Sequence, residues 1–349
     1  MVFDLNDNER KKLLSLFEQH EKNIDYLLYL QPFLWQKPGF LKDGIKGEDR
    51  FKRRDFLFEK LEEEYPFPNG YIKKNIKWDS QLLRAGDYSI NPYLKAIKDL
   101  SINKDGWSLS SKKLEAYSLF PFEEEYHYGS NYSLKMNLAY FEKDYIYPSL
   151  SLYDREWMSL NPYEIRTMET VINCARGKVL TLGLGLGYFA FMAHLKEEVK
   201  EVHIVEMDLE LIKLFNECLL PLFPYPEKIH IHKADAFYFI KNVNDKNFDF
   251  IFADLWHDVS DGLPMYLKLK STFNMFKYAQ CFYWIESSLI TYLRALVVGV
   301  MKDEYFKTTN EYDDIQHLIK EKLQKQTITN SYDLDNLLNI QGLEKLLFN

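Results

Sequence analysis

The chain has 349 residues, of which 46% are hydrophobic and 16% aromatic. This composition argues against a disordered protein, and the length predicts about two domains. The net charge of −8 is unfavourable for general nucleic-acid binding, so we expect no DNA partner. Three cysteines, Cys174, Cys218 and Cys281, form no C-x-x-C pair and are typical of free thiols in a reducing compartment.

The amino-terminal residues and the longest apolar run indicate no membrane association. Charged side chains appear as early as Asp4 and Asp7, so we expect no secretory signal. The apolar run Leu289–Met301 is interrupted by Arg294 and is shorter than the roughly 20 residues that span a bilayer. We therefore predict a buried helix at this run and a cytoplasmic location.

The first part of the chain is predicted to be mainly helical. Asn6, with Glu9 three residues later, resembles a capping box, and Leu13, Leu14 and Phe17 follow at helical spacing. The stretch Leu138–Leu152 alternates between apolar and polar residues, which predicts strands.

A strand, a glycine turn, a helix and a second strand are predicted after Lys178. Val179–Leu182 is a β-prone apolar run, and Val202–Val205 is another that ends at Glu206. Between them, Tyr188–Leu195 is apolar nearly all round and predicts a buried helix. The turn before this helix lets the backbone approach a ligand closely, because it contains Gly183, Gly185 and Gly187.

Three further strands are each predicted to end near a carboxylate. Lys228–Lys233 precedes Asp235, Phe248–Ala253 precedes Asp254, and Phe282–Ile285 precedes Glu286. Ligands of doubly wound sheets bind outside the carboxyl ends of the strands. The acidic side chains are therefore expected near a binding site, although such an acid can also cap the next helix.

The spacing of the glycines separates two classes of nucleotide site. A dinucleotide fingerprint, G-x-G-x-x-G, would need glycine where this chain has Tyr188. The spacing G-x-G-x-G, followed by Glu206, resembles the class I S-adenosylmethionine-dependent methyltransferases. This resemblance implies a Rossmann-like, doubly wound and mostly parallel α/β sheet that binds S-adenosylmethionine. It also implies ribose contacts from Glu206 and adenine contacts from Asp235 and Ala236.

The chain resembles the spermidine-synthase-like branch of this superfamily most closely. The resemblance rests on VEMDLELIKLF, KADA and FADLWHDVSDGLPMYLKLK. In that branch one aspartate ends the fourth strand and a second lies in a gating loop. Asp254 matches the first, and Asp258 or Asp261 approximates the second. Leu186 stands where the polyamine synthases have an aspartate in the glycine turn, and Thr181 stands where many methyltransferases have an acid.

The predicted site combines three groups of residues. The predicted cofactor-binding residues are Gly183, Gly185, Gly187, Glu206, Asp235, Ala236 and Asp254. The predicted catalytic residues, which orient or deprotonate the acceptor, are Asp254, His257 and Asp258. The predicted substrate contacts are Trp256, Asp261 and Tyr163. We predict no metal site, since His230 and His232 alternate on a strand without a cysteine pair.

Three functions remain open at this point. The leading hypothesis is methyl transfer from S-adenosylmethionine to a small molecule. The alternatives are an aminopropyltransferase that makes a polyamine and a non-catalytic nucleotide-binding scaffold. A homo-oligomer is possible under each of them.

The predicted domain organisation has four parts. They are a mainly helical region (1–135), a small β-element (136–162), the cofactor domain (163–305) and a helical carboxyl-terminal extension (306–349). The usual antiparallel hairpin that closes a methyltransferase sheet has no clear counterpart in the sequence.

Overall fold

A five-stranded parallel sheet forms the centre of the protein, for which a computed structural model describes residues 1–36, 50–64, 79–122, 132 and 137–348. The strands lie in the order β11-β10-β9-β12-β13, and every neighbouring pair is parallel. Their bounds are β9 (Gly177–Leu182), β10 (Val199–Glu206), β11 (Ile229–Lys233), β12 (Phe250–Ala253) and β13 (Gln280–Tyr283). This is the strand order of a doubly wound sheet.

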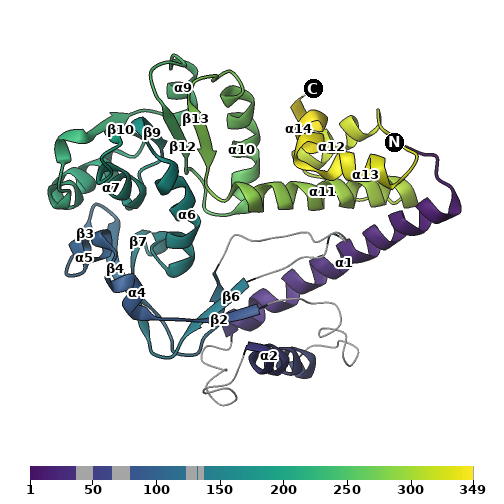
Figure 1. The fold of residues 1–349 in the computed structure, drawn as a ribbon, viewed down its shortest axis with the longest axis horizontal. Coiled ribbons are helices and arrows are strands. Elements are labelled where there is room, and N and C mark those ends of the chain that lie inside the picture. Colours follow the sequence, from purple (N-terminus) through teal and green to yellow (C-terminus); the bar gives the residue numbers. More distant parts are fainter. Residues whose placement is uncertain (37–49, 65–78, 123–131, 133–136, 349) are drawn as a thin grey trace.

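Helices cover both faces of this sheet, so its central strands are buried (Figure 1). On one face, Phe189 of α7 (Tyr188–His194) packs on Phe252, with ring centroids 4.6 Å apart. On the other face, Phe239 of α9 (Ala236–Lys241) packs on His232 of β11. All four residues of β12 are fully buried, which explains why its sequence is continuously apolar rather than alternating.

The predicted parallel α/β sheet is confirmed, and all five of its strands form. The last one ends at Tyr283 instead of Ile285, because the backbone of Ile285 turns into the left-handed region with φ 47°. Helices alternate with these strands: α6 (Pro162–Cys174), α7, α8 (Leu209–Leu214), α9 and α10 (Val259–Phe273). Helix α8 continues as a π-helical turn over Phe215–Leu219.

Two smaller sheets lie beside the parallel sheet. One is antiparallel, in the order β3-β4-β7-β8, and the other has the order β2-β6-β5. Their bounds are β2 (Asp79–Leu83), β3 (Ile102–Lys104), β4 (Trp107–Leu114), β5 (Phe120–Pro121), β6 (Asn137–Phe141), β7 (Tyr145–Leu152) and β8 (Arg155–Ser159). The last of these strands, β8, leads directly into α6 and so brings the antiparallel sheet next to the glycine turn.

The described part of the region before residue 136, for which the sequence predicted a mainly helical segment, contains helices and several short strands. Its helices are α1 (Asp7–Gln36), α2 (Arg50–Glu64), α4 (Ala85–Ser89) and α5 (Pro92–Ile97). Its strands β2 to β5 pair with one another or with β6 and β7. Strands β2 and β5 pair with β6, and β4 pairs with β7, so these strands depend on residues 137–152 for their partners.

The two ends of the chain meet (Figure 1). Strand β1 (Val2–Phe3) pairs with β14 (Thr327–Ile328), and Phe17 of α1 contacts Tyr305 of α11 (Glu286–Phe306). The chain then forms α12 (Asp314–Leu323), α13 (Ser331–Leu338) and α14 (Ile340–Phe348).

Among the described residues no antiparallel hairpin follows β13 in the central sheet. None of the described helices combines the length and the apolar character needed to cross a membrane.

Candidate functional site

The glycine turn after β9 adopts a backbone that favours glycine at all three positions. Gly183, Gly185 and Gly187 have φ values of 101°, 50° and 72°. A side chain at Gly183 would collide with the carbonyl oxygen of Asp254, and one at Gly187 would lie 2.6 Å from the Phe215 ring. Gly183 and Gly187 thus allow close packing within the domain, and a side chain at Gly185 would collide with the Met158 sulfur. Gly183 and Gly185 both line the cavity described below.

Glu206 closes this turn from the end of β10. Its carboxylate accepts hydrogen bonds from the backbone N–H groups of Leu184 (3.2 Å), Met207 (2.7 Å) and Asp208 (2.8 Å). Burial raises the pKa of this carboxyl, and the backbone hydrogen bonds oppose that rise. A carboxylate offers about four acceptor positions, so Glu206 retains capacity for one more donor.

A cavity of 170 Å³ opens over the glycine turn, at the carboxyl ends of β9, β10 and β12. Three carboxylates line it, from Glu164, Glu206 and Asp254, together with three tryptophans and His257, but no lysine or arginine of the described chain does. The full set is Trp157, Met158, Glu164, Gly183, Leu184, Gly185, Glu206, Met207, Asp254, Leu255, Trp256, His257 and Trp284. Its charge therefore suits a cation, and its aromatic faces suit one as well.

Unlike Glu206, the side chains of Asp254 and Glu164 accept no hydrogen bond from the described residues. No hydrogen bond within the described residues reaches the Asp254 carboxylate, and burial raises its pKa to about 7. Burial also raises the pKa of Glu164, and the nearby charge of Asp254 adds to the rise. Both acids consequently hold protons more tightly than free carboxyl groups do, and a bound cation would favour their ionised forms.

His257 is held by Asp261, four residues later, at the start of α10. The Nδ1 atom of His257 lies 3.0 Å from Oδ2 of Asp261. Since this contact places the ring proton on Nδ1, the Nε2 atom carries the lone pair. Nε2 is buried without a hydrogen-bond partner, and the His257 ring meets Trp157 edge to face, with centroids 4.5 Å apart. The arrangement matches a base with its orienting carboxylate.

Trp256 is the other aromatic residue that the sequence singled out. Its side chain is buried and packs against Gly262 of α10, where a side chain on that glycine would lie 2.7 Å from the ring. Its Nε1–H is also buried without a partner. The cavity wall therefore contains an unused donor beside the unused acceptor of His257.

Of the predicted site residues, Gly183, Gly185, Glu206, Asp254, Trp256 and His257 line the cavity. The other acids mainly cap helices. Asp235 accepts from the backbone N–H of Tyr238 at the start of α9, and Asp258 and Asp261 form a capping box at the start of α10. Ala236 is the buried first residue of α9, Gly187 precedes α7, and Tyr163 packs against the hydrophobic core.

The two departures from the family pattern are both buried. The Thr181 hydroxyl lies 3.4 Å from the carbonyl oxygen of Gly183, and Leu186 is fully buried. The backbone of Leu186 is held by the Tyr93 hydroxyl on its carbonyl and by the Met158 sulfur, 3.2 Å from its N–H. Neither side chain supplies the acid that the resemblance led us to look for at these two positions, and Met158 covers the turn.

Sequence reasoning missed several cavity residues. Trp157 and Met158 come from β8 of the separate antiparallel sheet. Of the neighbouring pair Tyr163 and Glu164 at the start of α6, the sequence favoured Tyr163, but Glu164 is the one that lines the cavity. Trp284 follows β13 and donates from Nε1 to Thr167 at 3.0 Å. Glu286, predicted at the same strand end, instead accepts from Tyr266 (2.9 Å) and Lys270 (3.0 Å), away from the cavity.

Comparisons with known proteins found solved structures only. No protein-family model matches the sequence, and no curated protein matches it. A spermidine synthase from Thermotoga maritima matches with 13% identity and a TM-score of 0.32, over 42% of this chain and 54% of that one. A probable spermidine synthase from Corynebacterium glutamicum matches with 14% identity and a TM-score of 0.29, over 45% and 52%.

A third match is a spermidine synthase in complex with the transition-state analogue AdoDATO, with 14% identity and a TM-score of 0.29, over 42% of this chain and 54% of that one. The chain thus spans about half the length of each of these three solved structures.

Proposed function

We propose that this protein is a transferase that takes an alkyl group from an adenosyl sulfonium donor and delivers it to an amine. The observation that carries the proposal is the cavity's charge: three carboxylates and three tryptophans, with no lysine or arginine of the described chain in the lining. Sulfonium and ammonium groups are both cations, which such a cavity stabilises through ion pairing and through aromatic faces.

The donor's adenosyl part fits the glycine turn and Glu206. Gly185 has no side chain to block a ligand, and the remaining acceptor position of Glu206 suits a ribose hydroxyl. A cavity of 170 Å³ is smaller than the roughly 300 Å³ typical of small-molecule sites. Binding therefore requires Met158 to move away from the turn.

The reaction needs little covalent help from the protein. The amine nitrogen attacks the carbon bonded to the sulfonium, so that a C–N bond forms while the C–S bond breaks and its electron pair stays on sulfur. The nitrogen loses one proton, for which we propose as acceptor the Nε2 atom of His257 in the cavity wall, which has no hydrogen-bond partner among the described residues. Asp254 and Glu164 would hold the ammonium groups in line.

The cavity's charge favours a donor without a carboxylate. The ionised forms of Asp254 and Glu164, which a bound cation favours, would repel the α-carboxylate of S-adenosylmethionine, whereas the decarboxylated donor carries only an ammonium group on its tail. We therefore prefer aminopropyl transfer to methyl transfer. Methyl transfer remains the second candidate because Leu186 stands where the polyamine synthases have an acid.

Calorimetry with three ligands tests the proposal. We expect decarboxylated S-adenosylmethionine to bind more tightly than S-adenosylmethionine, and both to bind more tightly than neutral methylthioadenosine. Incubation of each donor with a panel of diamines, followed by mass spectrometry, then identifies the transferred group. Tightest binding of the carboxylate-bearing donor, with methylated product, would reverse our preference between the two reactions.

Two further outcomes would contradict the proposal itself. Absence of binding of all three ligands at millimolar concentration would exclude an adenosyl donor. Binding without any product, across the whole panel of amines, would favour the non-catalytic scaffold.

A further inference from the structure

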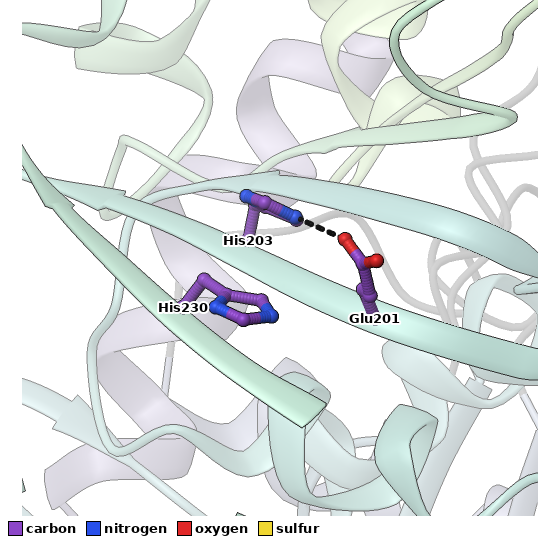
Figure 2. A group of neighbouring side chains, drawn as sticks. All are labelled: Glu201, His203 and His230. Carbon is purple, nitrogen blue, oxygen red and sulfur yellow. Dashed lines mark hydrogen bonds and ion pairs between the residues drawn. The ribbon is translucent and has the colours of Figure 1, made fainter. Parts of the chain in front are cut away.

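A second group of ligating side chains lies on the central sheet, away from the cavity. Glu201 and His203 alternate on β10, and His230 on β11 is directly paired with His203. All three project from the face that α9 covers, because residues two apart on a strand share a face and paired residues do too. One ligand atom from each lies within 4.8 Å of the others, and Figure 2 shows the three side chains gathered on the two strands.

Hydrogen bonds orient the central histidine of this group. Its Nε2 atom lies 2.9 Å from Oε2 of Glu201 (Figure 2), and its Nδ1 atom lies 2.8 Å from Nε2 of His232. Metal-binding histidines usually have such a second contact on the ring nitrogen that does not bind the metal. The atom of His203 that faces Glu201 is therefore already aimed at the point where a shared ion would lie.

We propose that Glu201, His203 and His230 bind a divalent transition metal of the zinc type. Imidazole nitrogen and carboxylate oxygen are the donors that zinc accepts alongside thiolate, and three protein ligands with one water is a common coordination set. In a tetrahedral site with bonds of about 2.0 Å, neighbouring ligand atoms lie about 3.3 Å apart. The ligand atoms now lie within 4.8 Å of one another, and the proposal requires the exposed His230 ring to rotate so that they approach that value.

The bound metal would join the edge strand of the sheet to its neighbour. Strand β11 is at the edge, and only β10 pairs with it in this sheet. Glu201 precedes Glu206 by five residues on the same strand, which corresponds to about 16 Å. This distance separates the metal site from the cavity, so the ion would stabilise the sheet rather than touch the reacting groups.

The Lys178 side chain would compete with a metal ion for Glu201. Its removal should therefore change metal affinity in the opposite direction to removal of a ligand. Its ammonium group lies 2.9 Å from Oε2 of Glu201, the oxygen that also faces His203. A cation entering the site must displace this ammonium group or tolerate its repulsion. Lys178→Gln should therefore tighten metal binding, an effect that no loss of structure would produce.

The experiment titrates Zn²⁺ and Co²⁺ into the full chain, purified without a histidine tag, and follows the heat of binding and the visible absorption of Co²⁺. We expect one ion per chain. His230→Gln and Glu201→Gln should each weaken binding more than about tenfold. His317→Gln is the matched control, because His317 is an exposed histidine on α12.

Melting temperatures in a chelator show whether each variant is folded. The proposal is overturned if the wild-type chain binds neither ion at millimolar concentration. It is also overturned if folded His230→Gln and Glu201→Gln bind as tightly as the wild type, or if Lys178→Gln weakens binding.

Discussion

The carboxyl ends of β10 and β12 present the same kind of side chain in opposite situations. At β10, three backbone N–H groups hold Glu206. At β12, no group of the described chain donates to the Asp254 carboxylate, although it is half-buried and its pKa is raised by loss of solvent. A carboxylate that is shielded from water and accepts no hydrogen bond costs stability, so Asp254 lowers the free energy of unfolding. Glu206, at the end of β10, is therefore a preformed hydrogen-bond acceptor. Asp254, after β12, is a charge that no donor of the described chain compensates.

The largest expected effect of this difference is on stability as a function of pH. The pKa of Asp254 is raised from 3.8 to about 7, so the folded chain binds a proton more tightly than the unfolded chain. The contribution of Asp254 to the free energy of unfolding is therefore fully present below about pH 4 and is lost as the pH rises through about 7. The loss is up to about 4 kcal/mol. Asp254→Asn should remove it, which urea unfolding between pH 4 and pH 8 would measure.

The control for this measurement is Glu197→Gln, a neutralised acid on the exposed surface. Its unfolding free energy should follow that of the wild type at every pH. If the wild type and Asp254→Asn also gave parallel curves, Asp254 would not be the uncompensated charge described above.

The second effect concerns which ligands each strand end recognises. Asp254→Asn should weaken binding of the decarboxylated sulfonium donor by about 3 kcal/mol, more than a hundredfold, because it removes the partner of a buried charge. It should change the binding of neutral methylthioadenosine little. Glu206→Gln is the matched substitution at β10 and should weaken both ligands equally, since the ribose is common to them. Calorimetry with the two ligands distinguishes these patterns, and equal losses for Asp254→Asn would contradict the assignment.

The central sheet could be predicted from the sequence because its signals are local. A continuous apolar run such as Phe250–Ala253 can only be satisfied by burial on both faces, and the glycine turn with Glu206 fixes the order of strand, turn and helix. Strands such as Trp107–Leu114 were missed because they contain no valine or isoleucine and carry serines and lysines. They form through pairing with β7, a partner about 40 residues away, which local pattern does not reveal.

The candidate site was predicted in part for the same reason. Asp254 and His257 follow a recognisable strand, whereas Trp157, Met158 and Glu164 reach the cavity from outside the sheet. The proposed metal group of Glu201, His203 and His230 has no sequence signature, because His203 and His230 meet only through strand pairing. Residues that are neighbours in space but distant in the chain have no characteristic sequence spacing, so a motif search does not find them.

The third prediction concerns His257, which follows β12, and tests whether it acts as a base. Asp261 orients His257 through Nδ1, so Asp261→Asn should lower kcat/KM about tenfold, because the imidazole loses the carboxylate that fixes its orientation. Asp258→Asn is the matched control, since both aspartates cap α10 but only Asp261 hydrogen-bonds the ring. Equal kcat/KM values for the two variants would assign both aspartates to capping alone.

The smallest expected effect concerns Met158, which covers the turn between the two strand ends. Its sulfur lies 3.2 Å from the backbone N–H of Leu186 and occupies space that the donor needs. Met158→Ala should therefore tighten the binding of sulfonium and neutral ligands alike, by about 1 kcal/mol, the scale of one hydrogen bond and a local packing contact. Calorimetry would measure it, with Met275→Ala, at an exposed methionine, as the control. Weaker binding of both ligands would instead mean that the Met158 side chain packs against the bound nucleoside, and the cavity would then be a formed site rather than a covered one.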